Sequence, residues 1–366
     1  MKTPVAVLTP SAQRLPGIDA LKALGCVLIV WHHLAFYGPM SDVVHTAAPG
    51  LMNWLYDYAR MAVQVFLVVG GFLAASVLAP EGVAVFQQPG RLILRRYQRL
   101  APPLLVALLV TTVVAALVRP WLPHPSVPDM PTVWQVLAHV FLLQDIVGQE
   151  ALSAGIWYVA IDFQLFVMSV LLFTLACHAH RRWPGLPARA GVWVVLGLAA
   201  ASLLVFNRRT ELDMTGLYFF GAYALGMLAW WASRSPWPAR WLLAIAVLGV
   251  LALVLDFRGR LLVALVVALV LVALQRSRRA GRWLEAPWLL QLGQISYSVF
   301  LIHFAVVLGV NAVVSQFWPT QLVANALGML AAFGLSLLAG QALYLGVESR
   351  RRPARVSAPP EARIAP

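Results

Sequence analysis

Ala20-Leu-Lys-Ala-Leu-Gly-Cys-Val-Leu-Ile-Val-Trp-His-His-Leu34 is an apolar stretch that contains a cation, Lys22, and an imidazole, His33, eleven positions apart. In an α-helix, eleven steps return to within roughly 20° of the same face, about 16 Å further along the axis. Lys22 and His33 therefore lie in one line along a helix. The apolar residues around them place that helix in a membrane, where ionisable side chains are costly and are functional candidates.

The composition of the whole chain indicates a membrane protein. Of its 366 residues, 61% are hydrophobic and only 11% are charged, and the mean hydropathy is +0.79. These values and the long apolar runs exclude a soluble globular domain. We predict an all-α polytopic fold with ten transmembrane helices. The expected spans are 20–37, 60–79, 100–119, 157–178, 191–206, 216–232, 241–256, 260–275, 293–314 and 322–346.

The distribution of basic residues predicts the orientation of these spans. If the N-terminus is cytoplasmic, all but six of the 27 lysines and arginines fall on the cytoplasmic side, as the positive-inside rule requires. We therefore expect both termini in the cytoplasm and a multi-pass protein of the inner (plasma) membrane. The net charge of +13 then reflects topology, and we expect no nucleic-acid partner, because the chain has no aromatic-interleaved basic patch. The six exceptions are Arg60, Arg119, Arg208, Arg209, Arg258 and Arg260.

The chain is expected to form one membrane domain, residues 17–349, between a cytoplasmic tail at 1–16 and a basic tail at 350–366. Residues 120–156 form the longest external loop, which is rich in proline. Within it, 134–147 is amphipathic and short, which favours an interfacial or re-entrant helix. The two cysteines, Cys26 and Cys177, fall in spans, and neither a disulfide framework nor a metal site is expected from them.

Three polar side chains are expected at similar depth in the outer half of the membrane. The first span rises toward His33, whereas the second and fourth spans descend from Gln64 and Asp162. A carboxylate on one nitrogen of an imidazole fixes its tautomer and makes the other nitrogen a better base. We therefore predict a His33–Asp162 pair. The plainer alternative is that His33 hydrogen-bonds between packed helices, although a carboxylate at this depth needs a partner in any case.

Two further histidines accompany this group. His303 follows Ser296-Tyr-Ser298 in a later span, where it is either part of a site or satisfied by the neighbouring hydroxyls. His32 lies about 100° around the helix from His33, so the two cannot face one site.

A cluster of arginines, Arg91-Leu-Ile-Leu-Arg-Arg-Tyr-Gln-Arg99, precedes the third span. Arg91, Arg95 and Arg99 recur every four residues and form a cationic stripe at the cytoplasmic surface. Guanidinium groups suit phosphate oxygens, although such a stripe also binds lipid headgroups or sets topology. Lys22 adds a cation at the same membrane face and favours a phosphate-bearing ligand. Acyl-coenzyme A fits this pattern, with phosphates at one end and a long arm that carries a thioester toward His33.

Several segments resemble the acyltransferase-3 family of integral membrane acyltransferases, which move acyl groups from cytosolic acyl-CoA onto extracytoplasmic glycans and other hydroxyl acceptors. The resemblance runs from about residue 14 to 350. Lys22 and His33 fit the family's hallmark of a basic residue, ten residues and a presumed catalytic histidine. The matching segments are Arg14-Leu-Pro-Gly-Ile-Asp-Ala-Leu-Lys22, Val63-Gln-Val-Phe-Leu-Val-Val-Gly-Gly-Phe72, Arg91 to Pro102, Trp157-Tyr-Val-Ala-Ile-Asp-Phe-Gln-Leu-Phe166 and Leu292-Gly-Gln-Ile-Ser-Tyr-Ser-Val-Phe-Leu-Ile-His303.

The resemblance implies an O-acyltransferase with acyl-CoA, most simply acetyl-CoA, as co-substrate and without a bound cofactor or metal. The implied partners are membrane lipid, the acyl-CoA donor and a glycan or other hydroxyl acceptor. His33 is then the base, oriented by Asp162. The acyl-CoA-binding residues are Lys22, Arg91, Arg95, Arg96 and Arg99, and the supporting pocket residues are Asp19, Gln64, Trp157, Tyr158, Ser296, Tyr297 and His303.

Four positions depart from the family pattern. Lys22 stands where arginine is usual, Gln64 where aspartate is common, Gly70 where serine is common and Asp162 where glutamate is usual. Lysine keeps the charge but not the bidentate geometry of arginine. These departures bear on the acceptor more than on the class of reaction.

Two other classes of function are compatible with buried ionisable groups. A proton-coupled transporter would use His33 and Asp162 as a relay, and broken helices with paired glycine or proline interruptions would favour it. A protein that only organises the membrane has no use for Lys22, His33 and Asp162, which are costly to bury. We therefore take the acyltransferase as the leading hypothesis.

Overall fold

The computed structural model describes residues 15–277 and 282–351, in which every regular element is a helix. The predicted tails, 1–16 and 350–366, and the motif residue Arg14 lie largely outside this part of the chain. The longer helices are α1 (Pro16–Phe36), α4 (Val63–Leu78), α5 (Pro89–Val118), α7 (Trp157–Arg182), α8 (Ala190–Leu204), α9 (Gly216–Arg234), α10 (Pro238–Leu255), α11 (Gly259–Arg276), α12 (Pro287–Phe317) and α13 (Leu322–Leu343). The short helices are α2 (Pro39–His45), α3 (Pro49–Asp57), η1 (Ala59–Ala62), η2 (Phe206–Arg208), η3 (Thr210–Leu212), α6 (Val133–Val140), η4 (Arg282–Glu285), η5 (Tyr344–Glu348) and η6 (Ser349–Arg351).

Within the described ranges, nine helices are long and apolar enough to cross a membrane, and they coincide with nine of the ten predicted spans. The tenth predicted span, 216–232, is helix α9, which is not among the nine, so the count of ten is not confirmed. Nearly all residues of α9 are buried, because it packs against α4, α7, α8, α10 and α11. Its sequence is therefore adapted to contact with protein, and it carries glycines and aromatic residues where a lipid-facing helix carries aliphatic ones.

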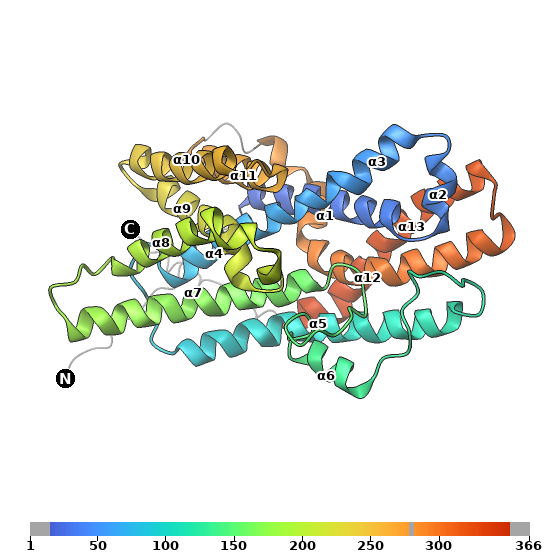
Figure 1. The fold of residues 1–366 in the computed structure, drawn as a ribbon, viewed down its shortest axis with the longest axis horizontal. Helices are drawn as coiled ribbons and strands as arrows, with labels where there is room; N and C mark the ends of the chain where they lie inside the picture. Colours follow the sequence, from blue (N-terminus) through green and yellow to red (C-terminus); the bar gives the residue numbers. More distant parts are fainter. Residues whose placement is uncertain (1–14, 278–281, 352–366) are drawn as a thin grey trace, which may run out of the picture.

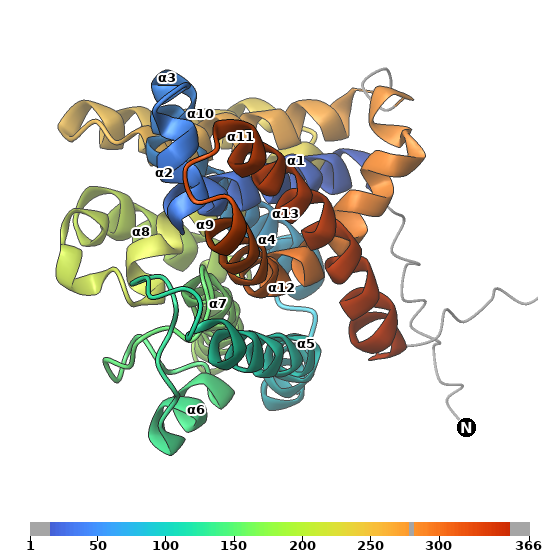
Figure 2. The same cartoon turned by 90° about the vertical axis from the view of Figure 1, so that its right-hand side faces the viewer.

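Helices α4 and α9 cross at very short range in the middle of the bundle. A Cβ atom at Gly71 of α4 would collide with the backbone carbonyl of Tyr223, and one at Gly226 of α9 would collide with the carbonyl of Val68. Small residues at such a crossing let two backbones approach closely. Figures 1 and 2 show this pair between α10 and α11 on one side and α5 and α7 on the other.

Helices α1 and α12 form a second close pair, which α13 and α5 flank in Figure 2. Gly293 of α12 leaves room for the backbone of Asp19, since a Cβ there would collide with it. This contact fixes the register of α1 against α12 and thereby the relative heights of the histidines on the two helices.

The arginine cluster is not a segment before a span but the first third of one continuous helix. Helix α5 begins at Pro89, rather than near residue 100, and runs through Pro102 and Pro103. Each proline lacks an N–H, which removes a hydrogen bond to the carbonyl four residues earlier. The arginines and the apolar span therefore belong to the same helix. The packing of α5 against α7 and α12 positions the arginines.

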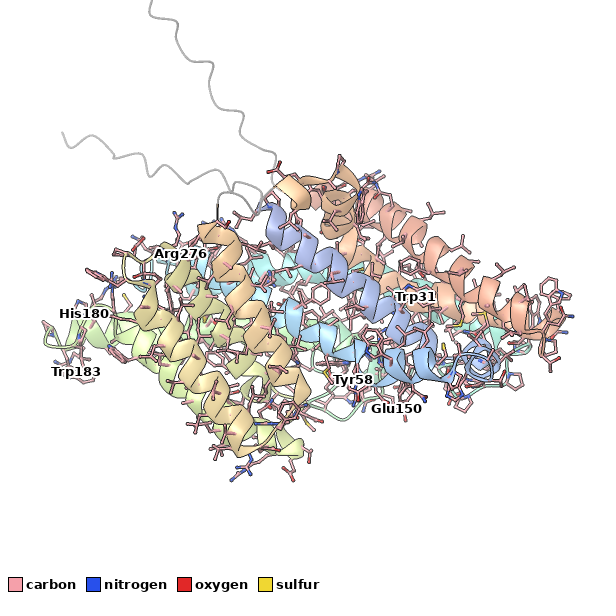
Figure 3. The ribbon with its side chains drawn as sticks, turned by 90° about the horizontal axis from the view of Figure 1, so that it is seen from above. Trp31, Tyr58, Glu150, His180, Trp183 and Arg276 are labelled. Carbon is pink, nitrogen blue, oxygen red and sulfur yellow. The ribbon has the colours of Figure 1, made fainter. Side chains whose placement is uncertain are left out.

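The predicted helix at 134–147 is shorter than expected. Helix α6 begins after Thr132, whose side chain accepts from the Gln135 amide in a capping box, and it ends at Val140. The chain then turns at Leu142, which has a φ of 58°, so the apolar pattern beyond residue 140 belongs to a turn. The interfacial position of α6 and the cytoplasmic orientation of the termini remain predictions. In Figure 3, Arg276, His180 and Trp183 lie in the left part of the view, and Tyr58 and Glu150 lie a little to the right of its middle.

Candidate active site

A cavity of about 150 Å³, here called the central cavity, lies among α1, α4, α5, α7 and α12. It brings together seven of the predicted site residues from four of these helices: Lys22, Arg96, Arg99, Tyr158, Asp162, Ser296 and Tyr297. Its other lining residues are Phe66, Val69, Gly70, Leu73, Leu100, Val159, Gln294, Phe300 and Glu348. The sequence patterns that predicted a shared site therefore identified residues that do meet in space.

Asp162 does not pair with His33, as the sequence suggested, but with Arg96. A guanidinium nitrogen of Arg96 lies 2.5 Å from Asp162 Oδ2, and the two side chains are 24% and 7% exposed. The guanidinium also lies over the ring of Phe166, 5.3 Å from its centroid. A buried carboxylate needs a compensating charge, and Arg96 meets that need on the neighbouring helix. The predicted orientation of His33 by Asp162 is therefore wrong.

His33 instead pairs with a second imidazole. Its Nδ1 lies 2.7 Å from Nε2 of His303, and the rings are almost parallel, with centroids 4.8 Å apart. The other nitrogen of His303, Nδ1, lies 2.7 Å from the carbonyl oxygen of Phe300. A carbonyl only accepts, so Nδ1 of His303 carries a proton and, in the neutral ring, Nε2 is an acceptor. His33 then donates from Nδ1, which leaves a lone pair on its Nε2.

The histidine pair lies one layer of side chains beyond the central cavity. Phe300 lines the cavity, and its ring centroid is 6.1 Å from that of His303. Gly155, with a φ of 74°, packs against both Phe300 and His33, since a Cβ there would fall 3.0 Å from each ring. Tyr158 covers Phe300 edge-on at 5.8 Å. His33 itself is 7% exposed, so Phe300, Gly155 and Tyr158 separate His33 from the cations.

The predicted cationic stripe divides into two faces. Arg91, Arg95 and Arg99 are exposed, whereas Arg96 turns inward, and only Arg96 and Arg99 line the central cavity. Arg91 donates to Gln88, 3.2 Å away. The residue that contacts the site most closely is therefore the one outside the four-residue repeat.

Lys22 lines the central cavity, and its Nζ lies 3.6 Å from Asp19 Oδ1. Asp19 is not among the lining residues, so it supports Lys22 from behind. Ser296 lines the cavity with its hydroxyl donated to the Gly293 carbonyl at 2.9 Å, and Tyr297 donates to the Leu100 carbonyl at 2.9 Å. The Tyr297 bond ties α12 to α5 beside the arginines.

Gln64 and Trp157 do not join this group. Both line a second cavity of about 660 Å³ on the other side of α4 and α7. Helix α7 lines both cavities with different residues: Trp157 lines the second cavity, and the adjacent Tyr158 lines the central one. The expectation that Gln64 shares a pocket with His33 and Asp162 is therefore not met.

The sequence reasoning missed one residue of the central cavity, Glu348, and one residue beside it, Tyr223. Glu348 is 6% exposed, lines the central cavity and accepts from Ser298 at 2.8 Å. Tyr223 of α9 packs beside Gly70. Glu348 could have been identified from the sequence as a carboxylate at the end of the last span, because a charged residue at such a position is costly and is a functional candidate. No pattern in α9 singled out Tyr223. Within the described ranges, no group of three or more His, Cys, Asp or Glu residues could hold a metal ion.

Comparisons with known proteins give a consistent result. Residues 15–345 match the model of an acyltransferase domain, Acyl_transf_3. The chain is 25% identical to "Acyltransferase MdmB" of Streptomyces mycarofaciens over 407 residues, which cover 98% of this chain and 99% of that protein. It is also 23% identical to "Regulator of hypoxia-inducible factor 1" of Caenorhabditis elegans over 182 residues, 46% of this chain and about a third (36%) of that protein. No solved structure matches.

Proposed function

Because this chain belongs to the acyltransferase-3 family of membrane acyltransferases, we propose that it transfers an acyl group from acyl-CoA to a hydroxyl of an extracytoplasmic or membrane-bound glycan. Acetyl-CoA is the simplest donor. The observation that carries the proposal is the central cavity, which is lined by cations and ends at Phe300, against the His33–His303 pair.

The cations of the central cavity suit the phosphates of the donor. Lys22 and Arg99 would bind phosphate oxygens, as ammonium and guanidinium groups do. Arg96, held by Asp162, would present its remaining donors in a fixed direction, and Arg91 and Arg95 would extend the contact along the exposed face of α5. The pantetheine arm would then run past Tyr158 to Phe300, whose ring must move aside for the thioester to reach His33.

His33 would act as the general base. Its Nε2 takes the proton of the acceptor hydroxyl while the oxygen attacks the thioester carbonyl. The carbon–sulfur bond then breaks, and the imidazolium returns the proton to the departing thiolate, which gives CoA and the O-acyl product. His303 holds His33 in the required tautomer through the 2.7 Å contact and shares the imidazolium charge.

The predicted topology implies that the donor and the acceptor reach the protein from opposite sides of the membrane. Lys22 and the arginines of α5 would face the cytoplasm, where acyl-CoA is made, and the acceptor would arrive from outside the inner (plasma) membrane. The proton-coupled transporter is not favoured, because the family and a full-length relative are both acyltransferases.

The test is the thermal stability of the detergent-purified protein with acetyl-CoA, and separately with pantetheine and with ADP. A ligand at about a hundredfold over its Kd stabilises a folded protein by about 2.7 kcal/mol. We expect acetyl-CoA to raise the Tm of the wild type, and the effect to be lost or weakened in Lys22→Ala and Arg99→Ala. Arg240→Ala removes an exposed cation from α10 and serves as the matched control. No effect of millimolar acetyl-CoA on a folded wild type would refute the proposal.

A further inference from the structure

The second cavity, of about 660 Å³, is four times larger than the central one and has the character of a binding site. It is lined by three arginines, Arg60, Arg258 and Arg260, by two aspartates and by an aromatic wall. The wall is Trp157 stacked on Phe219, with ring centroids 5.4 Å apart. Ligand sites combine an aromatic surface with a few convergent polar groups in this way.

The cavity lies where four helices begin. Gln64 is in the first turn of α4, Trp157 starts α7, Tyr218 is in the first turn of α9 and Arg260 is in the first turn of α11. The N-terminal ends of helices carry partial positive charge from the unpaired N–H groups. The dipoles and the arginines therefore act in the same direction, and they favour an anion.

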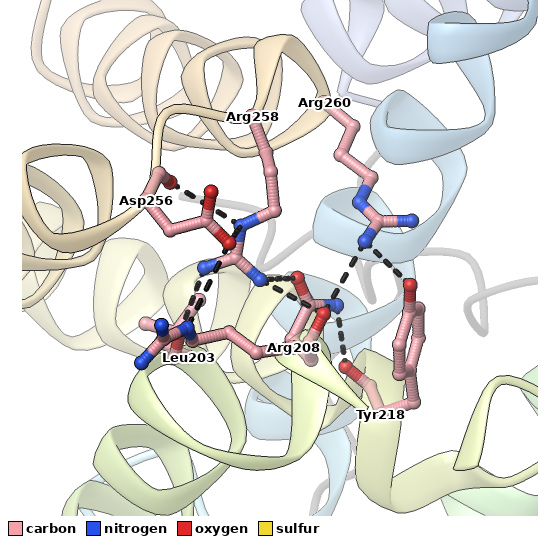
Figure 4. A network of polar contacts seen from close by, with 7 residues as sticks. Leu203, Arg208, Tyr218, Asp256, Arg258 and Arg260 are labelled. Carbon is pink, nitrogen blue, oxygen red and sulfur yellow. Dashed lines mark hydrogen bonds and ion pairs between the residues drawn. The ribbon is translucent and has the colours of Figure 1, made fainter. Parts of the chain in front are cut away.

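Arg258 makes contacts that stabilise the fold. Figure 4 shows its guanidinium between Asp256 and the carbonyl groups of Leu203 and Asn207, with the Asp256 carboxylate 3.4 Å from Nε. It joins the ends of α8, α10 and α11, and Asp256 compensates its charge. Arg258 therefore shapes the cavity wall rather than offering a free charge.

Arg260 and Arg60 are in a different situation. Among the residues that the structure describes, no carboxylate lies within ion-pair distance of either guanidinium. Arg260 donates to the hydroxyl of Tyr218 at 2.5 Å and lies over that ring, 4.8 Å from its centroid, but its Nε is buried and without a partner. A buried N–H of a charged group without a partner costs free energy, which an incoming oxyanion would recover.

The lining of the cavity also offers acceptors. Asp145 and Asp213 line it, and they lie near enough that the charge of Asp213 adds to burial, the larger cause, in raising the pKa of Asp145 above its ordinary value. Carboxylate oxygens accept hydrogen bonds from hydroxyl groups. The lining thus combines cations, which suit an oxyanion, with carboxylates, which suit hydroxyls.

The cavity is also connected to the histidine pair by a short piece of chain. Ala151 and Trp157 line the cavity, and Gly155, which lies between them, packs against His33. A ligand in the second cavity would therefore be separated from the base by the segment 151–157. The central cavity, where the donor is proposed to bind, is lined by other residues of the same helix α7.

We propose that the second cavity binds the acyl acceptor, and that this acceptor is a hydroxyl-bearing molecule with a phosphate or carboxylate group held by Arg60 and Arg260. The inference deepens the proposed function, because it assigns the acceptor a place and a charge. A phosphate of this kind belongs either to a soluble sugar phosphate or to a lipid headgroup.

The test uses glucose 1-phosphate, glucose and inorganic phosphate as probes in thermal-shift titrations of the full-length protein in nanodiscs of neutral lipid. We expect glucose 1-phosphate to stabilise the wild type, inorganic phosphate to do so more weakly and glucose to have no effect. Arg260→Gln and Arg60→Gln should each weaken the apparent affinity for glucose 1-phosphate by about tenfold, the usual consequence of losing a hydrogen bond to a charged group. Arg260→Lys should retain part of the affinity for glucose 1-phosphate. Arg209→Gln removes an exposed arginine that does not line the cavity and should leave the affinity unchanged.

A second arm distinguishes the two sources of the anion. In nanodiscs of phosphatidylglycerol, persistence of the glucose 1-phosphate effect supports a soluble acceptor, and its loss supports a headgroup in the same anion site. Equal stabilisation by glucose and glucose 1-phosphate, no stabilisation by any anion, or full affinity in both arginine variants would overturn the proposal. Loss of the acetyl-CoA effect in the Arg60 and Arg260 variants, but not in Lys22→Ala, would place the donor here and overturn it as well. If acetyl-CoA has no effect on a wild type that still binds glucose 1-phosphate, only the proposed donor fails.

Discussion

Nδ1 of His33 lies 2.7 Å from Nε2 of His303, so helices α1 and α12 are joined by two imidazoles within the apolar interior. The direction of this hydrogen bond is fixed at its far end, because Nδ1 of His303 faces the Phe300 carbonyl, 2.7 Å away. Because Nδ1 of His303 carries the proton, its Nε2 accepts from Nδ1 of His33, and Nε2 of His33 keeps a lone pair. This arrangement gives His33 the form that a general base requires, without a carboxylate.

Removal of either imidazole should reduce acyl transfer. We expect His33→Ala to lower kcat by about 10²–10⁴-fold, the usual contribution of a general base. His303→Ala should have a smaller effect, because His33 remains but loses its fixed tautomer. The Tm increase with acetyl-CoA should persist in both variants. Initial rates of CoA release with an acceptor present provide the measurement.

His32→Gln is the matched control for this pair. His32 adjoins His33 but contacts the Leu55 carbonyl, 3.1 Å away, an interaction that the glutamine amide can reproduce. Its turnover should match that of the wild type. Unchanged turnover in His33→Ala would remove the assignment of the base.

The Arg96–Asp162 pair is expected to contribute to both folding and donor binding. Asp162→Asn leaves Arg96 as a buried, uncompensated charge, and breaking a buried pair in this way costs about 3 kcal/mol or more. The double variant Arg96→Met with Asp162→Leu removes both charges and should recover much of the lost stability. It should not recover binding of acetyl-CoA. Unfolding midpoints and acetyl-CoA titrations of the three proteins separate the two roles, and restored binding in the double variant would show that the pair is only structural.

Helix positions were predictable from the sequence because apolar length is a strong signal. Nine predicted spans coincide with helices long and apolar enough to cross a membrane. The exception, α9, has a physical explanation. Its glycines allow close contact with α4, and the same glycines make the helix less apolar. Hydropathy detects contact with lipid, whereas α9 packs mostly against protein, so the prediction of a span at 216–232 is not confirmed by the apolar length of this helix.

The sequence identified several residues that share a cavity, but it predicted neither their depths nor their pairing correctly. Lys22, Arg96, Asp162 and Tyr297 line one cavity, although the predicted depths placed Lys22 and the arginines at the cytoplasmic face and Asp162 beside His33 in the outer half of the membrane. Depth along a helix says nothing of which neighbour is nearest, and that depends on helix rotation and on close crossings such as Gly293 against Asp19. For this reason Asp162 was assigned to His33, whereas the packing of α5 against α7 brings Arg96 to it.

Two adjacent glycines of α4 should respond differently to alanine. At Gly70 a Cβ would lie 3.4 Å from Asp162 Oδ1 and 3.1 Å from a ring carbon of Tyr223, in space that borders the central cavity. At Gly71 it would collide with the backbone of α9. Alanine favours a helix over glycine by up to about 1 kcal/mol, so Gly70→Ala should leave the Tm near that of the wild type while weakening acetyl-CoA binding. Gly71→Ala should lower the Tm strongly. Equal unfolding midpoints of the two variants would contradict the close crossing of α4 and α9.

His139 should make one loop sensitive to pH. Its Nδ1 donates to the Gln135 carbonyl at 2.7 Å and its Nε2 accepts from the Leu152 amide at 3.2 Å, so the neutral ring joins α6 to the segment before α7. Burial lowers the pKa of His139 below the ordinary value of 6.5, partly offset by the bond to Gln135. The unfolded form therefore binds a proton first, and the stabilisation present above pH 6.5 is lost as the pH falls toward the lowered value.

Hydrogen exchange at the Leu152 amide reports this loss directly, because that N–H donates to His139. After correction for the intrinsic pH dependence of exchange, its protection factor should fall as the pH drops below 6.5. The Gln135 amide, which donates to Thr132 Oγ1 at 3.1 Å, belongs to the same loop but its partner does not titrate, so its protection should change less. In His139→Gln the protection of Leu152 should be lower at neutral pH and independent of pH. A wild-type Leu152 amide whose protection stays constant from pH 7.5 to about 5 would show that the imidazole does not hold this loop.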